Sequence, residues 1–415
     1  MYAKGKYALL LLGAMVFSPL TSFLLSLRFY KSAVSQFFMI VFAFYFGSHI
    51  GLGWDLSHHY VDMREYYFNR SVSEILNNPL IYVAGPDYFH VALKIVLSRF
   101  HANPALFGGV MASIYAALFL NFFREFRSYY LKKMPVLCGL FLLCVVFIVQ
   151  YYWYYGVRYY PGFFFFAGFY MRYVNTHKYR YILISFLCVL FHFALSILPI
   201  AVLANWLLKK IGSWSRILLL STSLIYRTVA EDFVPLLIKY FPNLPFLRIS
   251  VTNTNIRREV LDRMIDIRTS GNYFYLYRDT LILVFGFFIL IYLWYKKADF
   301  RSKFTVLFGL FLTLFSFANF GYADLTFSDR VLKISLVFFY AFLFTVVYDN
   351  YHLFVAKRLT ILILVLIPLL YSIVSQLVEQ REYLFHLDLI LGNFFTDWHG
   401  GLTDYRGGMY HKYMN

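Results

Sequence analysis

The sequence is poor in charge and in cysteine. Charged residues make up 14% of its 415 residues, against about 25% in soluble domains. This scarcity excludes an ordinary soluble globular protein. The cysteines lie inside apolar runs and in no CxxC pair, so we predict neither a disulfide framework nor a cysteine metal site. They are Cys138, Cys144 and Cys188.

Several motifs of soluble enzymes are also missing. The chain has no GxxxxGK or GxGxxG phosphate loop and no GxSxG nucleophile elbow, which argues against nucleotide binding and α/β-hydrolase chemistry. The histidines in HHY at 58–60 and HGG at 399–401 are of a metal-ligating type, but neither lies in a ligand set with suitable spacing. We therefore predict no metal and no cofactor.

Long apolar stretches dominate what is present. The composition is 61% hydrophobic and 22% aromatic, with a mean hydropathy of +0.62. Apolar runs of roughly 17 to 25 residues recur along the chain, a length that crosses a hydrocarbon core of about 30 Å. The runs are approximately 7–27, 34–54, 103–123, 134–154, 159–175, 181–208, 215–230, 279–295, 304–320, 331–348 and 359–375. We predict an all-α, polytopic transmembrane helical bundle of about 11–12 spans, and we interpret the first run as a retained span rather than a signal peptide.

Lysine and arginine clusters in the short loops predict the orientation. The net charge of +17 is scattered between hydrophobic spans, so it indicates membrane topology and no nucleic-acid partner. All the clusters fall in the cytoplasm if the run 181–208 is a hairpin of two short helices that breaks between His192 and Pro199. We expect residues 1–375 to form one integral membrane domain, followed by an outer tail at 376–415.

Two long loops then lie on the outer face, at 55–102 and 231–278. The segment 86–100 is apolar but interrupted by charge, and the segment 255–267 has apolar residues along one helical side. We predict an interfacial or re-entrant helix at 86–100 and a helix on the membrane surface at 255–267.

Two arginines open spans at the predicted outer boundary. Arg158 precedes the run 159–175, close to Pro161, which suits a first helical turn. Arg330 precedes the run 331–348. Either side chain could merely snorkel, but charges kept within a bilayer usually face the bundle interior and mark function. Guanidinium groups pair bidentately with phosphate oxygens, so we predict that both are catalytic residues that bind a phosphate-rich anion.

Other outer residues complete the candidate site. His192, at the tip of the hairpin, is predicted as a third catalytic residue, either a base or a hydrogen-bond donor, although a lone histidine on an apolar face can also be a packing residue. The candidate substrate-binding residues are Arg227, Arg257, Arg258, Lys333, Asp62 and Tyr60. The arginines at 257–268 could equally form a solvated face of mixed sign, and the outer loops hold too many carboxylates for one base to be chosen.

The pattern resembles the EpsG-like branch of the Wzy-type polysaccharide polymerases. Members carry an aspartate- and tyrosine-rich outer loop after the second span, where this chain has GWDLSHHYVDMREYY. They also have a mid-chain Arg that opens an aromatic span, a membrane His before a Pro, and a late Arg that opens the penultimate span. Those features are matched by YYGVRYYPGFFFFAGF, VLFHFALSILP and SDRVLKISLVFF. The acidic-Pro-Gly element of the family is matched only approximately by GPDY, so the resemblance assigns no role to Asp87.

The resemblance implies a membrane glycosyltransferase that makes surface polysaccharide, such as O-antigen, capsule or exopolysaccharide. It would act at the outer, periplasmic face of a bacterial cytoplasmic (inner) membrane. A growing chain on undecaprenyl pyrophosphate would be transferred to the nonreducing-end sugar of a new lipid-linked repeat unit, without a nucleotide sugar or a required metal. The expected partners are these glycan substrates, the lipid bilayer and, as candidates, a chain-length regulator and a flippase.

Three other interpretations stay open. A polyprenyl-phosphate-sugar glycosyltransferase would use an acidic residue of the first outer loop, Asp55 or Asp62, usually with a metal. A lipid-linked oligosaccharide flippase fits twelve crossings and interior cations but predicts short outer loops. A membrane acyltransferase would use His192 as its base, but the usual paired acidic residue is missing.

Overall fold

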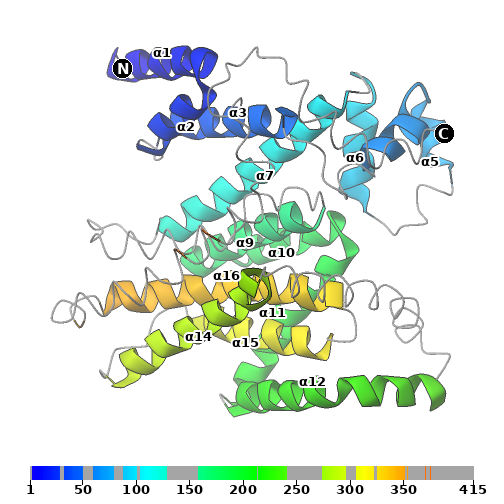
Figure 1. Cartoon of the computed structure of the whole chain (residues 1–415), viewed down its shortest axis with the longest axis vertical. Helices are drawn as coiled ribbons and strands as arrows, with labels where there is room; N and C mark the ends of the chain where they lie inside the picture. Colours follow the sequence, from blue (N-terminus) through cyan, green and yellow to red (C-terminus); the bar gives the residue numbers. More distant parts are fainter. Residues whose placement is uncertain are drawn as a thin grey trace. The chain divides into compact units, whose positions relative to one another are not determined.

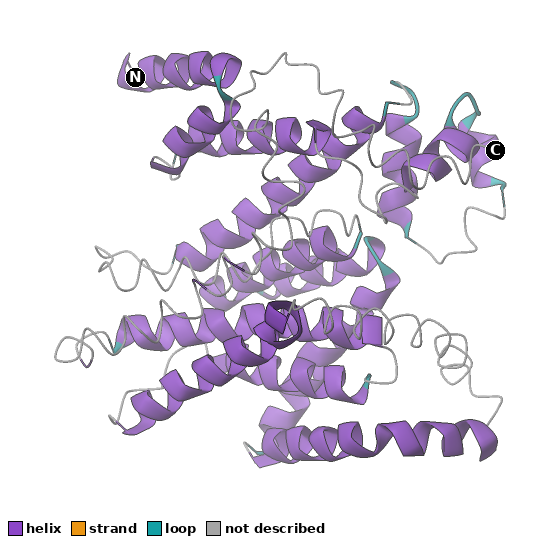
Figure 2. Cartoon of the chain, viewed as in Figure 1, coloured by secondary structure: helices purple, strands orange, loops and turns teal. Residues whose placement is uncertain are grey.

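The computed structural model describes residues 2–28, 32–49, 59–78, 87–100, 103–128, 158–212, 214–240, 273–295, 305–321 and 325–350, with the single residues 353, 370 and 374. Within these ranges every regular element is a helix, and no strand occurs (Figure 2). In the part of the chain that the structure describes, three helical stretches are long and apolar enough to cross a membrane, at Ala105–Arg127, Phe193–Ile211 and Phe327–Asp349. Shorter apolar helices accompany them, as the composition predicted.

The elements are named in chain order (Figure 1). They are α1 (Tyr2–Phe17), α2 (Pro19–Arg28), α3 (Ala33–His49), the π-helical turn η1 (Met63–Tyr67), α5 (Val72–Leu76), α6 (Tyr88–Leu97), α7 (Pro104–Arg127), α9 (Tyr159–Thr176), α10 (Tyr179–Phe186), the 3₁₀ turns η4 (Leu187–Leu190) and η5 (Phe193–Ser196), α11 (Ile197–Ile211), α12 (Trp214–Tyr240), α14 (Tyr273–Tyr295), α15 (Thr305–Phe320) and α16 (Leu325–Asp349).

The chain divides into two compact units. Unit 1 comprises residues 1–129, 151–196 and 380–415, and unit 2 comprises residues 130–150 and 197–379. Each is described by itself below. The single membrane domain at 1–375 stays a prediction.

The first predicted span, 7–27, is not one straight helix. It is broken between α1 and α2 at Ser18, just before Pro19, because proline cannot continue the backbone hydrogen-bond ladder of a helix interior. The hydroxyl of Ser22 donates to the carbonyl of Leu11 at 3.0 Å, and the hydroxyl of Tyr7 donates to the carbonyl of Leu25 at 3.0 Å. The two helices therefore fold back on each other.

Helices α3 and α7 pack closely because small residues line their contact. A Cβ added at Gly47 of α3 would lie 2.4 Å from the Cβ of Ala112 and 2.6 Å from the carbonyl oxygen of Gly108, both in α7. Such close backbone approach is the usual role of small residues between membrane helices. The pair fixes the position of α7, the longest helix of unit 1.

Helix α9 packs along α7 in the same direction. The ring of Phe164 lies edge-on to Tyr115 and to Phe119, at 5.4 Å between centroids in each case, and nearer the carboxyl ends Glu125 pairs with Arg172. If the predicted span 134–154 crossed the membrane once between them, α7 and α9 would run in the same direction. That run lies outside the described residues. Arg158 and Arg172 consequently stand at opposite ends of α9.

The break predicted in the run 181–208 is present, although its bounds differ. Regular α-helix stops at Phe186 and resumes at Ile197, and His192 lies between the two 3₁₀ turns that separate them. Pro199, predicted to end the break, already lies in the first turn of α11, where proline is tolerated.

In unit 2, α16 is the buried central helix. Most of its apolar span is buried, and Phe339 contacts Phe287 of α14 and Phe311 of α15, with centroids 5.3 Å and 4.6 Å away. Helices α15 and α16 are antiparallel, since the hydroxyl of Ser328 donates to the carbonyl of Ala318 at 2.8 Å.

Several predicted boundaries were wrong. Helix α16 begins at Leu325, so Arg330 lies in its second turn instead of preceding it. The predicted loop 231–278 is helical at both ends, because α12 continues to Tyr240 and α14 begins at Tyr273. The helix predicted at 86–100 is present as α6, and its interfacial or re-entrant position stays a prediction. The runs 134–154 and 359–375, the segment 255–267 and the tail 376–415 lie outside the described residues, apart from 370 and 374.

Candidate functional site

The centre of the candidate site is an ion pair between two elements of unit 1. Arg158 occupies the N-cap position of α9, and its Nη1 donates to Oδ2 of Asp87. Asp87 occupies the N-cap position of α6 but makes no capping hydrogen bond with its side chain. An N-cap aspartate usually stabilises its helix by about 1 kcal/mol. Here its carboxylate binds Arg158 instead.

Asp87 also holds the broken segment that carries His192. Its second oxygen, Oδ1, accepts a hydrogen bond from the main-chain N–H of Phe193 at 3.2 Å. Just before His192, the ring of Phe191 stacks on Phe89 of α6 at 4.1 Å between centroids. One buried carboxylate, 7% exposed, thus joins α6, α9 and the break between η4 and η5.

The hydrogen bond made by His192 assigns its tautomer. Nδ1 accepts from the main-chain N–H of Ala194 at 3.1 Å, so the proton of the neutral ring is on Nε2. The ring also lies edge-on to Tyr159, which follows Arg158. His192 can therefore offer an N–H donor close to the amino end of α9.

Gly162 allows this broken segment to lie against α9. A Cβ at Gly162 would lie 2.4 Å from Cδ1 of Leu195 and 2.6 Å from the Cβ of Phe191. A larger residue would push away the turn that positions His192.

A second polar group lies along α6. Nζ of Lys94 donates to Oδ2 of Asp62 at 3.1 Å, and Nδ1 of His59 lies 3.7 Å from the same oxygen. The ring of His90 is 4.0 Å from that of His59, between centroids. Lys94 and His90 are buried, at 4% and 3% exposed, whereas the Asp62 side chain is 47% exposed.

The charges of this group determine its protonation. Burial raises the pKa of Asp62, but the hydrogen bonds and charges of His59 and Lys94 outweigh burial and lower it to about 2. His90 lies on α6, which at about 15 Å for ten residues is too short to cross a bilayer. Burial, together with the nearby charges of His59 and Lys94, lowers the pKa of His90 well below its usual value. Asp62 is thus ionised near neutral pH and His90 is neutral.

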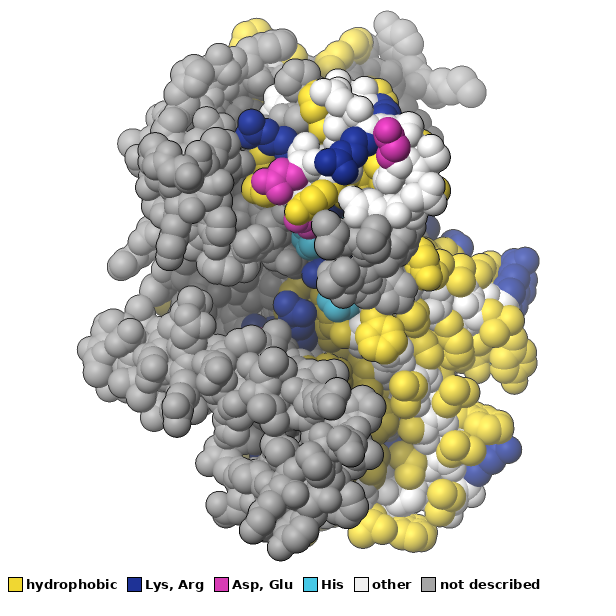
Figure 3. All heavy atoms as spheres, turned by 90° about the vertical axis from the view of Figure 1, so that its right-hand side faces the viewer, with side chains coloured by type: hydrophobic (Ala, Val, Ile, Leu, Met, Phe, Trp, Pro, Cys, Tyr) yellow, Lys and Arg dark blue, Asp and Glu magenta, His cyan; other side chains and the backbone are white. Residues whose placement is uncertain are grey.

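Asp87, His90 and Lys94 are spaced by three and four residues at the start of and along α6, on one face of the helix, so the two polar groups adjoin along it. We call Asp62, Asp87, His90, Lys94, Arg158 and His192 the polar cluster of unit 1. Figure 3 shows acidic, basic and histidine side chains gathered on one part of the visible face, whereas hydrophobic side chains cover much of the other described surface.

Sequence reasoning missed three members of the cluster. Asp87, His90 and Lys94 are spaced by three and four residues, which places them on one face of a helix. That spacing could have identified them, but the many apolar residues of α6 made the segment look like a plain interfacial or re-entrant helix.

Tyr60, predicted to bind substrate, is 5% exposed, and the centre of its ring lies 6.5 Å from the centre of the Phe107 ring.

The remaining described candidates belong to unit 2. Nη1 of Arg227 donates to Oδ1 of Asn319 at 3.3 Å, near the end of α15, and Arg330 follows in the first turns of α16. Nζ of Lys333 donates to Asp329 at 2.7 Å. These three cations lie at the end of unit 2 where α15 leads into α16. Arg257 and Arg258 fall outside the described residues.

No protein-family model, no curated protein and no solved structure matches this chain. Among the residues that the structure describes, no group of three or more His, Cys, Asp or Glu side chains is placed to hold a metal ion. The polar cluster itself therefore supplies the functional argument.

Proposed function

We propose that the protein polymerises undecaprenyl-pyrophosphate-linked oligosaccharide repeat units into a surface polysaccharide, at the outer face of a bacterial cytoplasmic membrane. In this proposal it is a polytopic membrane glycosyltransferase of the EpsG-like, Wzy-type kind. The observation that carries the proposal is the link from Arg158 through Asp87 to the segment of His192. The two residues predicted for catalysis in unit 1 share one carboxylate that orients both.

The amino end of α9 suits a phosphate. The first N–H groups of a helix and its macrodipole favour an anion there, and Arg158 adds a guanidinium at the same point. The sugar hydroxyl of the incoming repeat unit forms the new glycosidic bond as the glycosyl–pyrophosphate bond breaks. The departing pyrophosphate gains negative charge and takes up the proton of that hydroxyl. A fixed guanidinium stabilises that charge more in the transition state than in the ground state.

The remaining members of the cluster take supporting roles in the proposal. His192, protonated on Nε2, donates a hydrogen bond to the pyrophosphate or to a sugar oxygen, and so does not act as the base. Asp62, with a pKa of about 2, is a weak base at neutral pH. Its partly exposed carboxylate instead accepts hydrogen bonds from sugar hydroxyls. Arg227, Arg330 and Lys333 would bind the second lipid pyrophosphate.

The test uses the purified full-length protein and lipid-linked repeat units. We expect wild type to elongate them in the presence of a chelator, and Arg158→Ala or Arg330→Ala to accumulate single repeats. Arg70→Ala removes the same charge from an exposed loop and serves as the matched control. If both variants made glycan chains as long as those of wild type, Arg158 and Arg330 would not form the proposed pyrophosphate site.

Adding a chelator distinguishes the proposed polymerase from the principal alternative enzyme. Strict metal dependence would favour a polyprenyl-phosphate-sugar glycosyltransferase over a pyrophosphate-dependent polymerase. The low pKa of Asp62 argues against that residue as the base of such an enzyme, and Asp55 lies outside the described residues.

A further inference from the structure

A group of basic side chains lies at the end of α9 remote from Arg158. It is formed by the carboxyl ends of α7 and α9 and by the turn that leads into α10. We call it the basic corner, and its residues are Arg124, Arg127, Arg172, Lys178 and Arg180. Within the described stretches 121–128 and 172–187, Glu125 is the one acidic residue, so five cations face one carboxylate.

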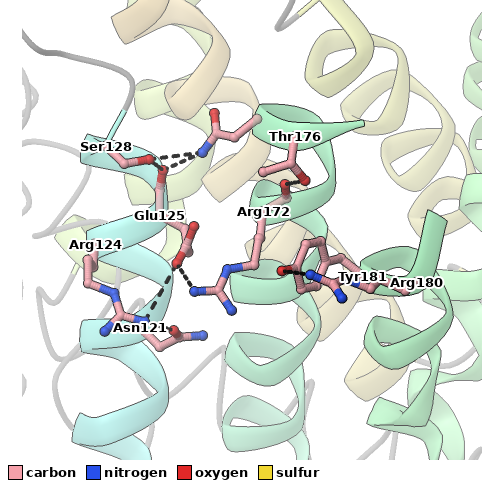
Figure 4. A network of polar contacts seen from close by, with 9 residues as sticks. Asn121, Arg124, Glu125, Ser128, Arg172, Thr176, Arg180 and Tyr181 are labelled. Carbon is pink, nitrogen blue, oxygen red and sulfur yellow. Dashed lines mark hydrogen bonds and ion pairs between the residues drawn. The ribbon is translucent and has the colours of Figure 1, made fainter. Parts of the chain in front are cut away.

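Glu125 organises the corner (Figure 4). Its Oε1 lies 3.0 Å from Nη2 of Arg172 and 3.5 Å from Nη2 of Arg124. The amide of Asn175 ties the two helices together, donating to the carbonyl of Glu125 at 2.7 Å and to Oγ of Ser128 at 3.1 Å. Arg124 is further held by Oδ1 of Asn121 at 2.8 Å. These contacts fix the guanidinium groups on rigid helix ends.

The ring of Tyr181 lies close to two of the guanidinium groups. The guanidinium carbons of Arg172 and Arg180 lie 5.1 Å and 4.8 Å from the centre of the Tyr181 ring, within cation–π range. Nη2 of Arg180 also donates to the Tyr181 hydroxyl at 2.9 Å. Although these contacts hold the side chains, Arg180 and Lys178 remain exposed, and the Arg124 side chain is 53% exposed.

A bilayer crossing by α7, whose carboxyl end forms part of the corner, would place the corner at the membrane boundary. The apolar span Ala105–Arg127 is about 35 Å long at 1.5 Å per residue, enough to cross a hydrocarbon core of about 30 Å. Arg124 and Arg127 form its last turn. Tyr179, 74% exposed, lies between Lys178 and Arg180 at the start of α10, and tyrosine is typical of the interfacial zone.

We propose that the basic corner binds the phosphate headgroup of an anionic phospholipid. The excess of cations matches a negatively charged headgroup better than a zwitterionic one, and guanidinium groups favour phosphate oxygens. Basic pockets between helices at this level are known to take such lipids. This inference does not rest on the proposed polymerase activity.

The test is native mass spectrometry of the full chain in detergent with added phosphatidylglycerol or phosphatidylcholine. We expect wild type to retain phosphatidylglycerol preferentially, and Arg124→Gln or Arg180→Gln to weaken retention about fivefold per charge removed. The corresponding lysine substitutions should restore much of it. Arg172 is left intact because it holds Glu125, and thermal unfolding in detergent checks that each variant is folded.

Three outcomes would overturn the inference. Wild type could retain both lipids equally, or Arg70→Gln, which removes an exposed charge elsewhere in unit 1, could weaken retention as much as the corner variants. Alternatively, millimolar inorganic phosphate could displace the lipid completely, which would indicate a site for free phosphate.

Discussion

Asp87 and Arg158 form an ion pair across 71 residues of sequence. A cation at the amino end of a helix is opposed by the macrodipole, so Arg158 needs a counter-ion in order to remain at the start of α9. Asp87 supplies it, and through the N–H of Phe193 the same carboxylate also holds the turn of His192. The pair thus assembles the polar cluster from segments that are remote in the chain.

Removing one partner of this pair should destabilise unit 1. Asp87→Ala leaves the Arg158 side chain, 20% exposed, without its carboxylate, and we expect a loss of about 2–3 kcal/mol. The double variant Asp87→Ala/Arg158→Ala should recover about 1–2 kcal/mol of that loss, because the uncompensated charge is gone. Thermal unfolding in detergent measures both changes. Additive losses would mean that the pair is not coupled.

Gly162→Ala should disturb the turn of His192. The added Cβ would meet Leu195 and Phe191 at less than 3 Å, and we expect a loss of about 1–3 kcal/mol from overpacking. Gly13→Ala is the matched control, since a Cβ there has nothing within 4 Å and alanine favours the helix. Equal thermal stability of the two variants would contradict the proposed packing.

The tautomer of His192 predicts which substitutions are tolerated. Glutamine retains an N–H donor whereas phenylalanine retains only the ring, so His192→Gln should keep more elongation activity than His192→Phe. Chain length from lipid-linked repeat units is the measurement. If glutamine were as inactive as phenylalanine while both variants remained folded, a role as base would be favoured.

Asp62 should stabilise the fold at neutral pH but not in strong acid. Its folded pKa of about 2 lies below the ordinary aspartate value of 3.8, so its contribution is complete above about pH 4 and is lost as the pH falls toward 2. Because the side chain is half exposed, we expect a contribution of about 1 kcal/mol after screening. The difference in thermal stability between wild type and Asp62→Asn, measured at pH 7 and at pH 3, should shrink on acidification. A constant difference would show that the carboxylate acts by packing.

The sequence predicted the class of structure and much of the helix order. Apolar runs of membrane-spanning length appear as helices α7, α9 and α15 at nearly their expected bounds, because hydrophobic length is a local property of the chain. The break around His192 was also legible, since the run 181–208 is too long for one ordinary span. The fold-back at Ser18 was missed because a single Pro19 had to be weighed against an otherwise continuous apolar run.

By itself, then, the sequence determined that the chain is helical and apolar, that Arg158 begins a helix, and that His192 lies in a break. Only the tertiary structure decided that Asp87 joins these two residues, and that Lys94 and His90 are buried beside them. The physical reason is that helix formation depends on neighbouring residues. The partner of a buried charge, in contrast, depends on which remote segments the packing of α6, α7 and α9 brings together.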